Sequence, residues 1–421
     1  MISSGTGRLS ALAGCLLAGL VFGAGALSAV LFSGFQAGAV VWQYGFLATT
    51  VFIAAVLLLP QDSPTETWWI LPIIAMLCHI GLLFIWRLAP PLFYYQLLWI
   101  ALGVGLFLLV VHGLPTILSL QRYKYLLGSA AALLLLATML FGTDIGGNRN
   151  WIVLGPVRVQ PSEIARLFFV LFLAGFLTDR QATMMQRFSL RNRDFWLPFL
   201  YAVSPLLLFW MISMGLLVLQ RDLGAALLFY GTAVMMIYAA TGKKRYLLGG
   251  TAAFAIGALV CYFLFAHVRV RFSIWLDPFR DPYGVSYQVV QSLYAFAAGK
   301  LFGVGLGQGV PATIPAIHTD FILAAIGEEW GMAAVASMIA LYWLMVFSLF
   351  QLARRQRSLF SIFLCCGFGA LFGLQTFMIA GGVMKLAPLT GVTLPFVSYG
   401  GSSLLSSFLL WGLVYVVAKR T

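Results

Sequence analysis

The sequence predicts an all-α integral membrane protein with about twelve membrane-spanning helices, and three observations support that fold class. Of its 421 residues, 62% are hydrophobic and only 9% are charged, and the mean hydropathy is +0.98. A water-soluble globule does not have this composition. Apolar runs of about 17 to 25 residues recur along the chain, and each is long enough to cross a bilayer as a helix. Transmembrane barrel strands would alternate polar and apolar residues, so a barrel is excluded.

The predicted spans follow one another with mostly short connections, so no separate soluble domain is expected. We divide the chain into an N-terminal two-helix extension, 1–67, and a core, 68–421, which contains a long outer loop at 267–319. Span boundaries read from apolar runs are uncertain by about two to four residues. The predicted spans are 11–33, 43–60, 68–87, 95–112, 124–142, 162–178, 196–219, 222–240, 245–266, 320–350, 359–382 and 402–418.

The distribution of basic residues predicts how these helices are oriented. With the N-terminus inside, most Lys and Arg residues fall in cytoplasmic loops, which is the positive-inside pattern. The pattern explains the net charge of +13 without a nucleic-acid partner. It places both termini in the cytoplasm and the loops 143–161, 267–319 and 383–401 outside. The basic residues on the predicted cytoplasmic side are Arg122, Lys124, Arg180, Arg187, Arg191, Arg193, Lys243, Lys244, Arg245, Arg354, Arg355, Arg357, Lys419 and Arg420.

The stretch from Ile314 to Gly331 carries three of the twelve carboxylates, where an outer loop turns into a membrane helix. Asp320 lies at the boundary, and Glu328 and Glu329 follow inside an apolar run. A charge at mid-bilayer costs about 2.5 to 3.5 kcal/mol, so such residues usually face a polar cavity. We expect a water-filled cleft at the membrane surface, with Asp320 at its floor and cations at its rim. The alternative is that Asp320 only caps a helix, because an acid suits the first turn.

The outer loop before residue 162 offers a cation, Arg149, and an aromatic plane at the interface, Trp151. Ser162 is expected to begin a helix in which Glu163 and Arg166 are three residues apart and can pair. One interpretation is an interfacial belt followed by a salt-bridged helix end. The other is an anion site for a lipid headgroup, because guanidinium groups bind phosphate in bidentate fashion.

Two outer connections have predicted structural roles. Arg221 and Asp222 lie in a very tight turn, and we interpret this charged pair as a structural link. The segment 383–401 contains too many Pro and Gly residues to form one straight helix. Non-helical backbone at membrane depth is tolerated only where it is buried in protein or lines a cavity. This segment is therefore expected to line the same cleft as Asp320.

The long loop 267–319 contains predicted turns and a predicted interfacial helix. Asp277 and Asp281 each precede a proline, a step that favours turns. The stretch GKLFGVGLGQG lacks the Lys-Ser/Thr ending of a nucleotide-binding P-loop, so no nucleotide is expected. A helix is predicted between the Asp-Pro turns and this glycine-rich stretch. It is expected to lie in the membrane interface, with a polar face formed by Gln288, Gln291 and Ser292.

The chemistry available on the outer side is that of carboxylates and cations. The sequence has no HExxH motif, no GxSxG motif and no cysteine ligand cluster, which disfavours hydrolysis by zinc or serine. A carboxylate can act as a general base on a hydroxyl while cations stabilise a departing phosphate. Together they suit transfer from a lipid-linked, phosphate-activated donor. Two hypotheses compete with this transferase: a flippase or transporter of such a lipid, and a structural scaffold.

Six motifs in order resemble the SEDS family (shape, elongation, division and sporulation), the RodA/FtsW/SpoVE peptidoglycan glycosyltransferases, from about Trp68 onward. They are GNRNW with QPSEIARL, the DLG at 222–224, DPYGVSYQVVQS, GVGLGQG, HTDFILAAIGEEWG and TGVTLPFVSYGGSS. The resemblance implies a polymerase that joins lipid II units with inversion and releases undecaprenyl diphosphate. It would act in cell shape or division at the outer face of the bacterial cytoplasmic membrane.

The resemblance also implies partners and a cofactor. The partners would be lipid II, the nascent glycan, membrane lipids and a class B penicillin-binding protein, the transpeptidase. A divalent cation, Mg²⁺ or Mn²⁺, would be a reasonable charge partner for the diphosphate, although no metal-ligand spacing indicates one.

The resemblance assigns roles to named residues. Asp320, in HTDF, would be the general base on the acceptor's 4-hydroxyl. Trp151 matches the family's functionally important tryptophan, and Arg149 and Arg166 are the candidates for the diphosphate. Ala316 stands where many relatives have a glutamate, which places more of the acid–base chemistry on Asp320. Further substrate-binding candidates are Glu163, His318, Thr319, Lys385 and Ser398, and supporting candidates are Asp222, Asp277, Asp281, Gln288, Gln291, Glu328 and Glu329.

Overall fold

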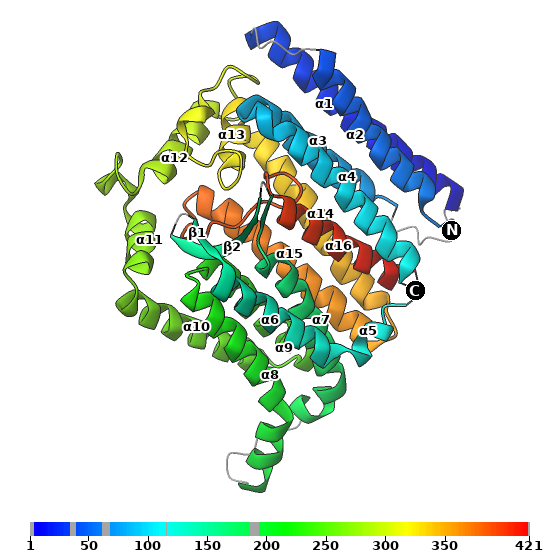
Figure 1. The fold of residues 1–421 in the computed structure, drawn as a ribbon, viewed down its shortest axis with the longest axis vertical. Helices are drawn as coiled ribbons and strands as arrows, with labels where there is room; N and C mark the ends of the chain where they lie inside the picture. Colours follow the sequence, from blue (N-terminus) through cyan, green and yellow to red (C-terminus); the bar gives the residue numbers. More distant parts are fainter. Residues whose placement is uncertain are drawn as a thin grey trace. The chain divides into compact units, whose positions relative to one another are not determined.

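The structure is a computed structural model that describes residues 4–33, 39–60, 68–114, 116–145, 147–155, 157–185 and 193–419. Helices make up nearly all of its regular structure (Figure 1). Ten helices within these ranges are long and apolar enough to cross a bilayer. The predicted all-α, multi-pass membrane fold is therefore confirmed. Arg187, Arg191 and Arg420 of the predicted basic pattern lie outside the described residues, as does residue 67, where the predicted extension ends.

Each of the predicted spans overlaps a long helix of the described chain. These helices are α1 (Ser4–Ser33), α2 (Ala39–Leu58), α3 (Ile70–Leu88), α4 (Pro90–Gly113), α6 (Lys124–Phe141), α7 (Ser162–Met185), α8 (Arg193–Leu219), α9 (Leu223–Thr241), α10 (Lys244–Leu264), α14 (Gly331–Arg355), α15 (Leu359–Val383) and α16 (Gly401–Ala418). The shorter helices are α5 (Ser119–Arg122), α11 (Ala266–Leu276), α12 (Tyr287–Gly299), α13 (Ile322–Glu329) and the 3₁₀ helices η2 (Pro278–Arg280) and η3 (Pro311–Thr313).

The predicted single span 320–350 is wrong in one respect, because it consists of two helices. α13 ends at Glu329, and α14 begins at Gly331, whose φ is +80°. A side chain at Gly331 would lie 2.3 Å from the carbonyl oxygen of Leu301, so only glycine allows this approach. The apolar run continues across both helices, and hydropathy therefore does not reveal the break.

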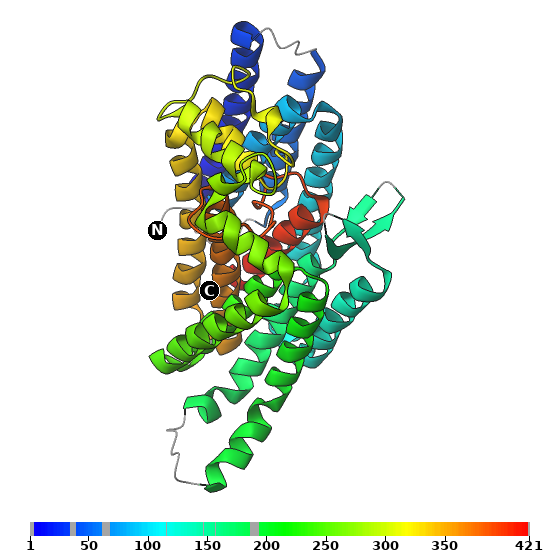
Figure 2. The same cartoon turned by 90° about the vertical axis from the view of Figure 1, so that its left-hand side faces the viewer.

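The outer loop 143–161 forms a small antiparallel sheet that the sequence analysis did not predict. Its strands are β1 (Thr143–Ile145), β2 (Asn148–Leu154) and β3 (Val157–Val159), in the order β1-β2-β3. In the second hairpin, Ile152 is paired with Val159 and Val153 with Arg158. Figure 2 shows the sheet beyond the ends of α6 and α7, to which its strands connect.

The chain divides into two compact units, each made of segments that are distant in sequence. In unit 1, α16 packs on α4, and α1 packs on α2 and α3 (Figure 1). In unit 2, α7 packs on α6 and α9. Unit 1 comprises Met1–Pro115, Cys261–Met345 and Gln375–Arg420, and unit 2 comprises Thr116–Val260 and Val346–Leu374 with the last residue.

The two N-terminal helices pack closely against α3. A Cβ atom at Gly14 of α1 would lie 2.6 Å from Pro72, so a small residue is needed at this crossing. His79 of α3 is fully buried, and its Nε2 lies 3.1 Å from the Thr49 hydroxyl of α2. The extension is thus tied to α3 by close packing and by a buried polar contact.

The acidic residues of α13 anchor the glycine-rich segment 303–310. Glu329 is fully buried, and Nη2 of Arg87 lies 3.3 Å from its Oε1. Arg87 also donates to the carbonyl oxygen of Gly309 at 3.2 Å. Oε1 of Glu328 accepts from the backbone N–H of Val310 at 2.9 Å. The partners of these acids are therefore an arginine and loop backbone, and not the polar cavity that the apolar run suggested.

We predict that Arg87→Met lowers the free energy of unfolding by about 3 to 5 kcal/mol, because Glu329 would then be buried without its cation. The double variant Arg87→Met/Glu329→Gln should recover most of this loss, since it removes both charges. Thermal unfolding in detergent measures the change. The control is Arg280→Met, at an exposed arginine of the same unit, which should stay within about 0.5 kcal/mol. Equal stability of Arg87→Met and the parent would contradict the anchoring role.

Candidate active site

Asp320 lies in the turn 315–321, directly before α13, and its side chain is partly exposed. The helix begins at Ile322 with Phe321 at its N-cap position, and no side chain caps it. The alternative that Asp320 only caps a helix is therefore wrong. The carboxylate is held beside the helix start and remains accessible to a small polar group.

The surroundings of Asp320 make its carboxylate more basic than usual. Burial raises the pKa of Asp320 to about 6, although a hydrogen bond from Thr319 and the positive charge of Arg271 act in the opposite direction. Burial lowers the pKa of the neighbouring His318, so its imidazole is neutral at pH 7. Near neutral pH, Asp320 is therefore mostly ionised and basic enough to accept a proton from a polarised hydroxyl.

The non-helical segment 384–400 is hydrogen-bonded to the turn that carries Asp320. The Ser398 hydroxyl donates to the carbonyl oxygen of Thr319 at 2.6 Å. The backbone N–H of Tyr399 donates to the carbonyl oxygen of His318 at 2.9 Å, and the two rings make an edge contact. The prediction that this segment is not one straight helix is confirmed, and the segment contacts the turn that carries Asp320. That the two line a common cleft stays a prediction.

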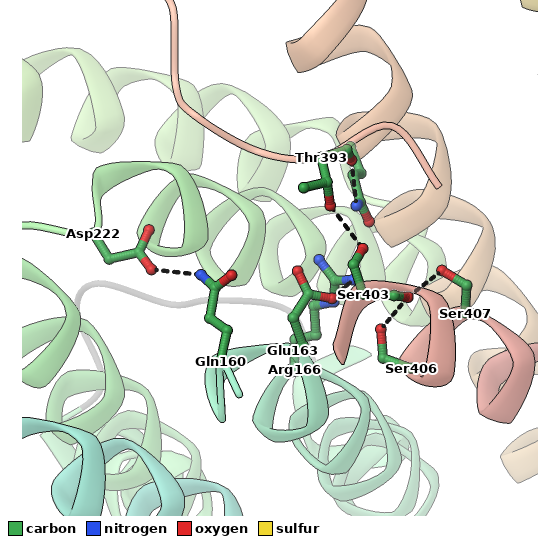
Figure 3. Close-up of polar contacts among 9 residues, drawn as sticks. Gln160, Glu163, Arg166, Asp222, Thr393, Ser403, Ser406 and Ser407 are labelled. Carbon is green, nitrogen blue, oxygen red and sulfur yellow. Dashed lines mark hydrogen bonds and ion pairs between the residues drawn. The ribbon is translucent and has the colours of Figure 1, made fainter. Parts of the chain in front are cut away.

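Buried side chains from several helices of unit 1 hold this segment. Gln96 of α4 donates to the carbonyl oxygen of Ser398 at 3.3 Å, and Gln375 of α15 donates to that of Thr393 at 2.9 Å. The Thr393 hydroxyl donates to the Ser403 hydroxyl at 2.7 Å, at the start of α16 (Figure 3). Backbone groups that no helix satisfies thus find partners inside the protein, as buried backbone groups require.

A second polar cluster, in unit 2, is centred on Asp222. Its carboxylate caps α9 by accepting from the N–H of Ala225 at 3.0 Å. It also accepts from Nδ2 of Asn150 at 2.9 Å. A further hydrogen bond comes from Nε2 of Gln160 at 3.2 Å (Figure 3). Asp222 therefore links β2, the loop residue Gln160 and the start of α9, which agrees with its interpretation as a structural link.

The two arginines considered for the diphosphate are both engaged within the protein. Arg166 is buried and forms the predicted ion pair with Glu163 (Figure 3). Arg149 is exposed, and its Nε donates to the carbonyl oxygen of Gly142 at 2.9 Å. Trp151 is half-buried in β2. The ion pair is confirmed, and the diphosphate role of these residues stays a prediction.

The remaining candidates lie in unit 1, on the loop elements. Asp277 and Asp281 are exposed, and Oδ2 of Asp281 accepts from the N–H of Val285 at 3.2 Å, as a turn residue should. Ser292 contradicts the predicted polar face of α12, because it is fully buried and its hydroxyl bonds the carbonyl oxygen of Val383 at 3.1 Å. The partly buried candidates are Gln288, Gln291 and Lys385.

The sequence analysis did not select Arg271 as a site residue, although its charge acts on Asp320. Its helix, α11, lies about fifty residues before Asp320, in the outer loop whose cations were expected at the rim of the cleft, and no local pattern pairs one of these arginines with Asp320. For a metal, the described residues contain no group of three or more His, Cys, Asp or Glu side chains close enough to hold an ion.

Comparisons with known proteins identify the family. The family model for FtsW, RodA and SpoVE, described as a cell cycle protein, matches residues 68–421. The peptidoglycan glycosyltransferase RodA of Mycobacterium tuberculosis is 37% identical over 388 residues, covering 87% of this chain and 81% of the relative. A probable peptidoglycan glycosyltransferase FtsW of Alcanivorax borkumensis is 35% identical over 339 residues, covering 78% and 84%.

Two solved structures share the fold. One comes from work on the structural coordination of polymerization and crosslinking by a peptidoglycan synthase complex. It has a TM-score of 0.69 and 31% identity, and the match covers 84% of this chain and 97% of that one. The crystal structure of the rod shape determining protein RodA of Thermus thermophilus has a TM-score of 0.58 and 28% identity, with 84% and 96% covered. The chain therefore belongs to the SEDS family of FtsW, RodA and SpoVE, whose curated relatives are peptidoglycan glycosyltransferases.

Proposed function

We propose that this protein polymerises lipid II into glycan strands and that Asp320 is the general base. Family membership supports the reaction class, and the curated relatives carry the name peptidoglycan glycosyltransferase. The observation that carries the residue assignment is a partly exposed carboxylate with a pKa raised to about 6, held in a turn by non-helical chain. A base of this strength suits proton removal from a hydroxyl near neutral pH.

In the proposed step, the carboxylate of Asp320 takes the proton of the acceptor sugar's 4-hydroxyl. The hydroxyl oxygen forms a bond to the anomeric carbon of the donor, and the bond from that carbon to the phosphate oxygen breaks. The carbon is inverted, and undecaprenyl diphosphate leaves with the bonding electron pair. Cations near the departing phosphate would stabilise its charge, and Arg149 and Arg166 remain the candidates.

The cellular setting follows from the same proposal. The multi-pass fold fits a bacterial cytoplasmic membrane, with both termini inside and Asp320 at the outer face. Lipid II and the nascent glycan would be the substrates, within the surrounding membrane lipids. A class B penicillin-binding protein would be the partner, which is supported by the structural similarity to a chain studied in a peptidoglycan synthase complex.

We predict that Asp320→Asn lowers the polymerisation rate by a factor of about 10² to 10⁴, because the amide cannot accept the hydroxyl proton. Purified protein, with its transpeptidase partner, would be given labelled lipid II, and glycan length would be measured on gels. The matched control is Asp144→Asn, an exposed carboxylate on β1 that should polymerise like the parent. If headgroup translocation occurs in vesicles and no polymer forms, the protein is a flippase.

The pH dependence of the parent gives an independent prediction. Asp320 is inactive as a base when protonated, so the rate should fall about tenfold per pH unit below pH 6. As pH rises through 6 the carboxylate ionises, and the rate should reach a plateau above about pH 7. Initial rates between pH 5 and pH 8 test this. An acid limb centred near the ordinary aspartate value of about 4 would argue against Asp320.

We also propose that a divalent cation, Mg²⁺ or Mn²⁺, accompanies the diphosphate as a charge partner. Such a cation would stabilise the negative charge of the leaving diphosphate. Treatment with EDTA should then reduce the polymerisation rate, and added Mg²⁺ should restore it. Full activity after exhaustive chelation would show that protein cations suffice.

A further inference from the structure

Helix α11 carries two arginines whose side chains have different partners. Nη1 of Arg271 lies 3.3 Å from the carbonyl oxygen of Leu389 and 3.4 Å from that of Thr390. Nη1 of Arg269, two residues earlier, donates instead to the carbonyl oxygen of Phe263 at 3.0 Å, and its side chain is exposed. One arginine therefore holds the end of the preceding helix, and the other holds the non-helical segment 384–400.

Arg271 contacts the carbonyl groups of Leu389 and Thr390, and the next residue in the chain lies against the carboxylate of Asp320. Gly391 follows Thr390 and has a φ of +70°, and a Cβ atom built on it would lie 3.6 Å from Oδ2 of Asp320. Leu389 and Thr390 lie in no helix or strand, so they have no ladder of backbone hydrogen bonds to fix them. Contact with the guanidinium is thus a direct restraint on the chain beside Asp320.

We propose that Arg271 is a positioning residue for the general base: it holds the carbonyls of Leu389 and Thr390 so that Gly391 stays against the carboxylate of Asp320, and it supplies the positive charge that keeps this carboxylate ionised. The proposal rests on the proposed function of Asp320 as the base. It assigns a role in proton transfer to α11, a helix that the reaction chemistry alone does not identify.

The charges around Asp320 support this assignment. Burial raises the pKa of Asp320, and the charge of Arg271 lowers it. His318, in the same turn, is neutral at pH 7 because burial lowers its pKa, and its ring contacts Tyr399 of the facing segment. Lys385 is the cation within that segment, and Glu328 and Glu329 of α13 face the segment 303–310 and Arg87 instead. Arg271 is the charged group that acts on the base.

The test compares Arg271→Gln, Arg271→Lys and the control Arg269→Gln, each as full-length protein with its partner and labelled lipid II. The two glutamine variants lose the same charge from the same helix. For Arg271→Gln, we expect the acid limb of the kcat profile to move up by as much as about one pH unit, because the positive charge of Arg271 lowers the pKa of Asp320. At pH 6 this is a loss of several-fold, up to about tenfold.

The other variants separate positioning from substrate binding. Arg269→Gln should keep the parent profile, and Arg271→Lys should keep the acid limb in place because the charge remains. Arg271→Lys should still lower kcat at an unchanged KM for lipid II, because an ammonium cannot reproduce the guanidinium's contacts to the two carbonyls. Coinciding profiles for the two glutamine variants would overturn the proposal. So would a raised KM with an unmoved limb, which indicates a substrate-binding arginine.

Two controls keep the result interpretable. Thermal unfolding identifies variants that do not fold. If Arg271→Gln does not fold, Arg271→Lys tests the positioning role in its place. Parent-like kcat and KM in Arg271→Lys would then overturn that role. The parent protein distinguishes failure of the proposed function from failure of the role of Arg271. A parent that makes no polymer refutes the proposed function itself. A parent that polymerises with an acid limb near pH 6, while Arg271→Gln leaves that limb in place, refutes only the role of Arg271.

Discussion

The proposed active site depends on hydrogen bonds between two non-helical segments, the turn 315–321 and the segment 384–400. Buried backbone groups outside a helix must find partners within the protein. Here Ser398 bonds the carbonyl of Thr319, and Tyr399 bonds that of His318, so each segment satisfies part of the other. The aspartate that follows these carbonyls is thereby fixed without a helix or a strand, and its carboxylate remains partly exposed.

Much of the fold could be predicted from the sequence because a bilayer dictates helix length and composition. The apolar runs located every long helix, and the Ser162 start of α7 and its Glu163–Arg166 pair followed from local spacing. Features set by close contact between distant segments were missed. The break at Gly331 depends on the backbone of Leu301, and hydropathy carries no information about such an approach.

The candidate site was predictable in part for the same reason. Asp320 could be identified from its position at the start of a membrane segment and from a motif. The contacts of Arg271 with Leu389 and Thr390 join residues more than a hundred positions apart, which no local pattern encodes. For Ser292 the sequence prediction was wrong, because this polar residue was expected on the polar face of an interfacial helix. Its side chain is buried, and its hydroxyl donates to a backbone carbonyl of α15.

The acids of this chain differ in how far the fold already uses them. Asp222 caps a helix and binds two amides, Glu163 is paired with Arg166, and Glu329 is paired with Arg87. The side chains of all three acids are buried. Asp320 differs in that its side chain is partly exposed, and its pKa is raised to about 6 by burial. Proton transfer near neutral pH therefore favours Asp320, which is also partly exposed to an incoming hydroxyl.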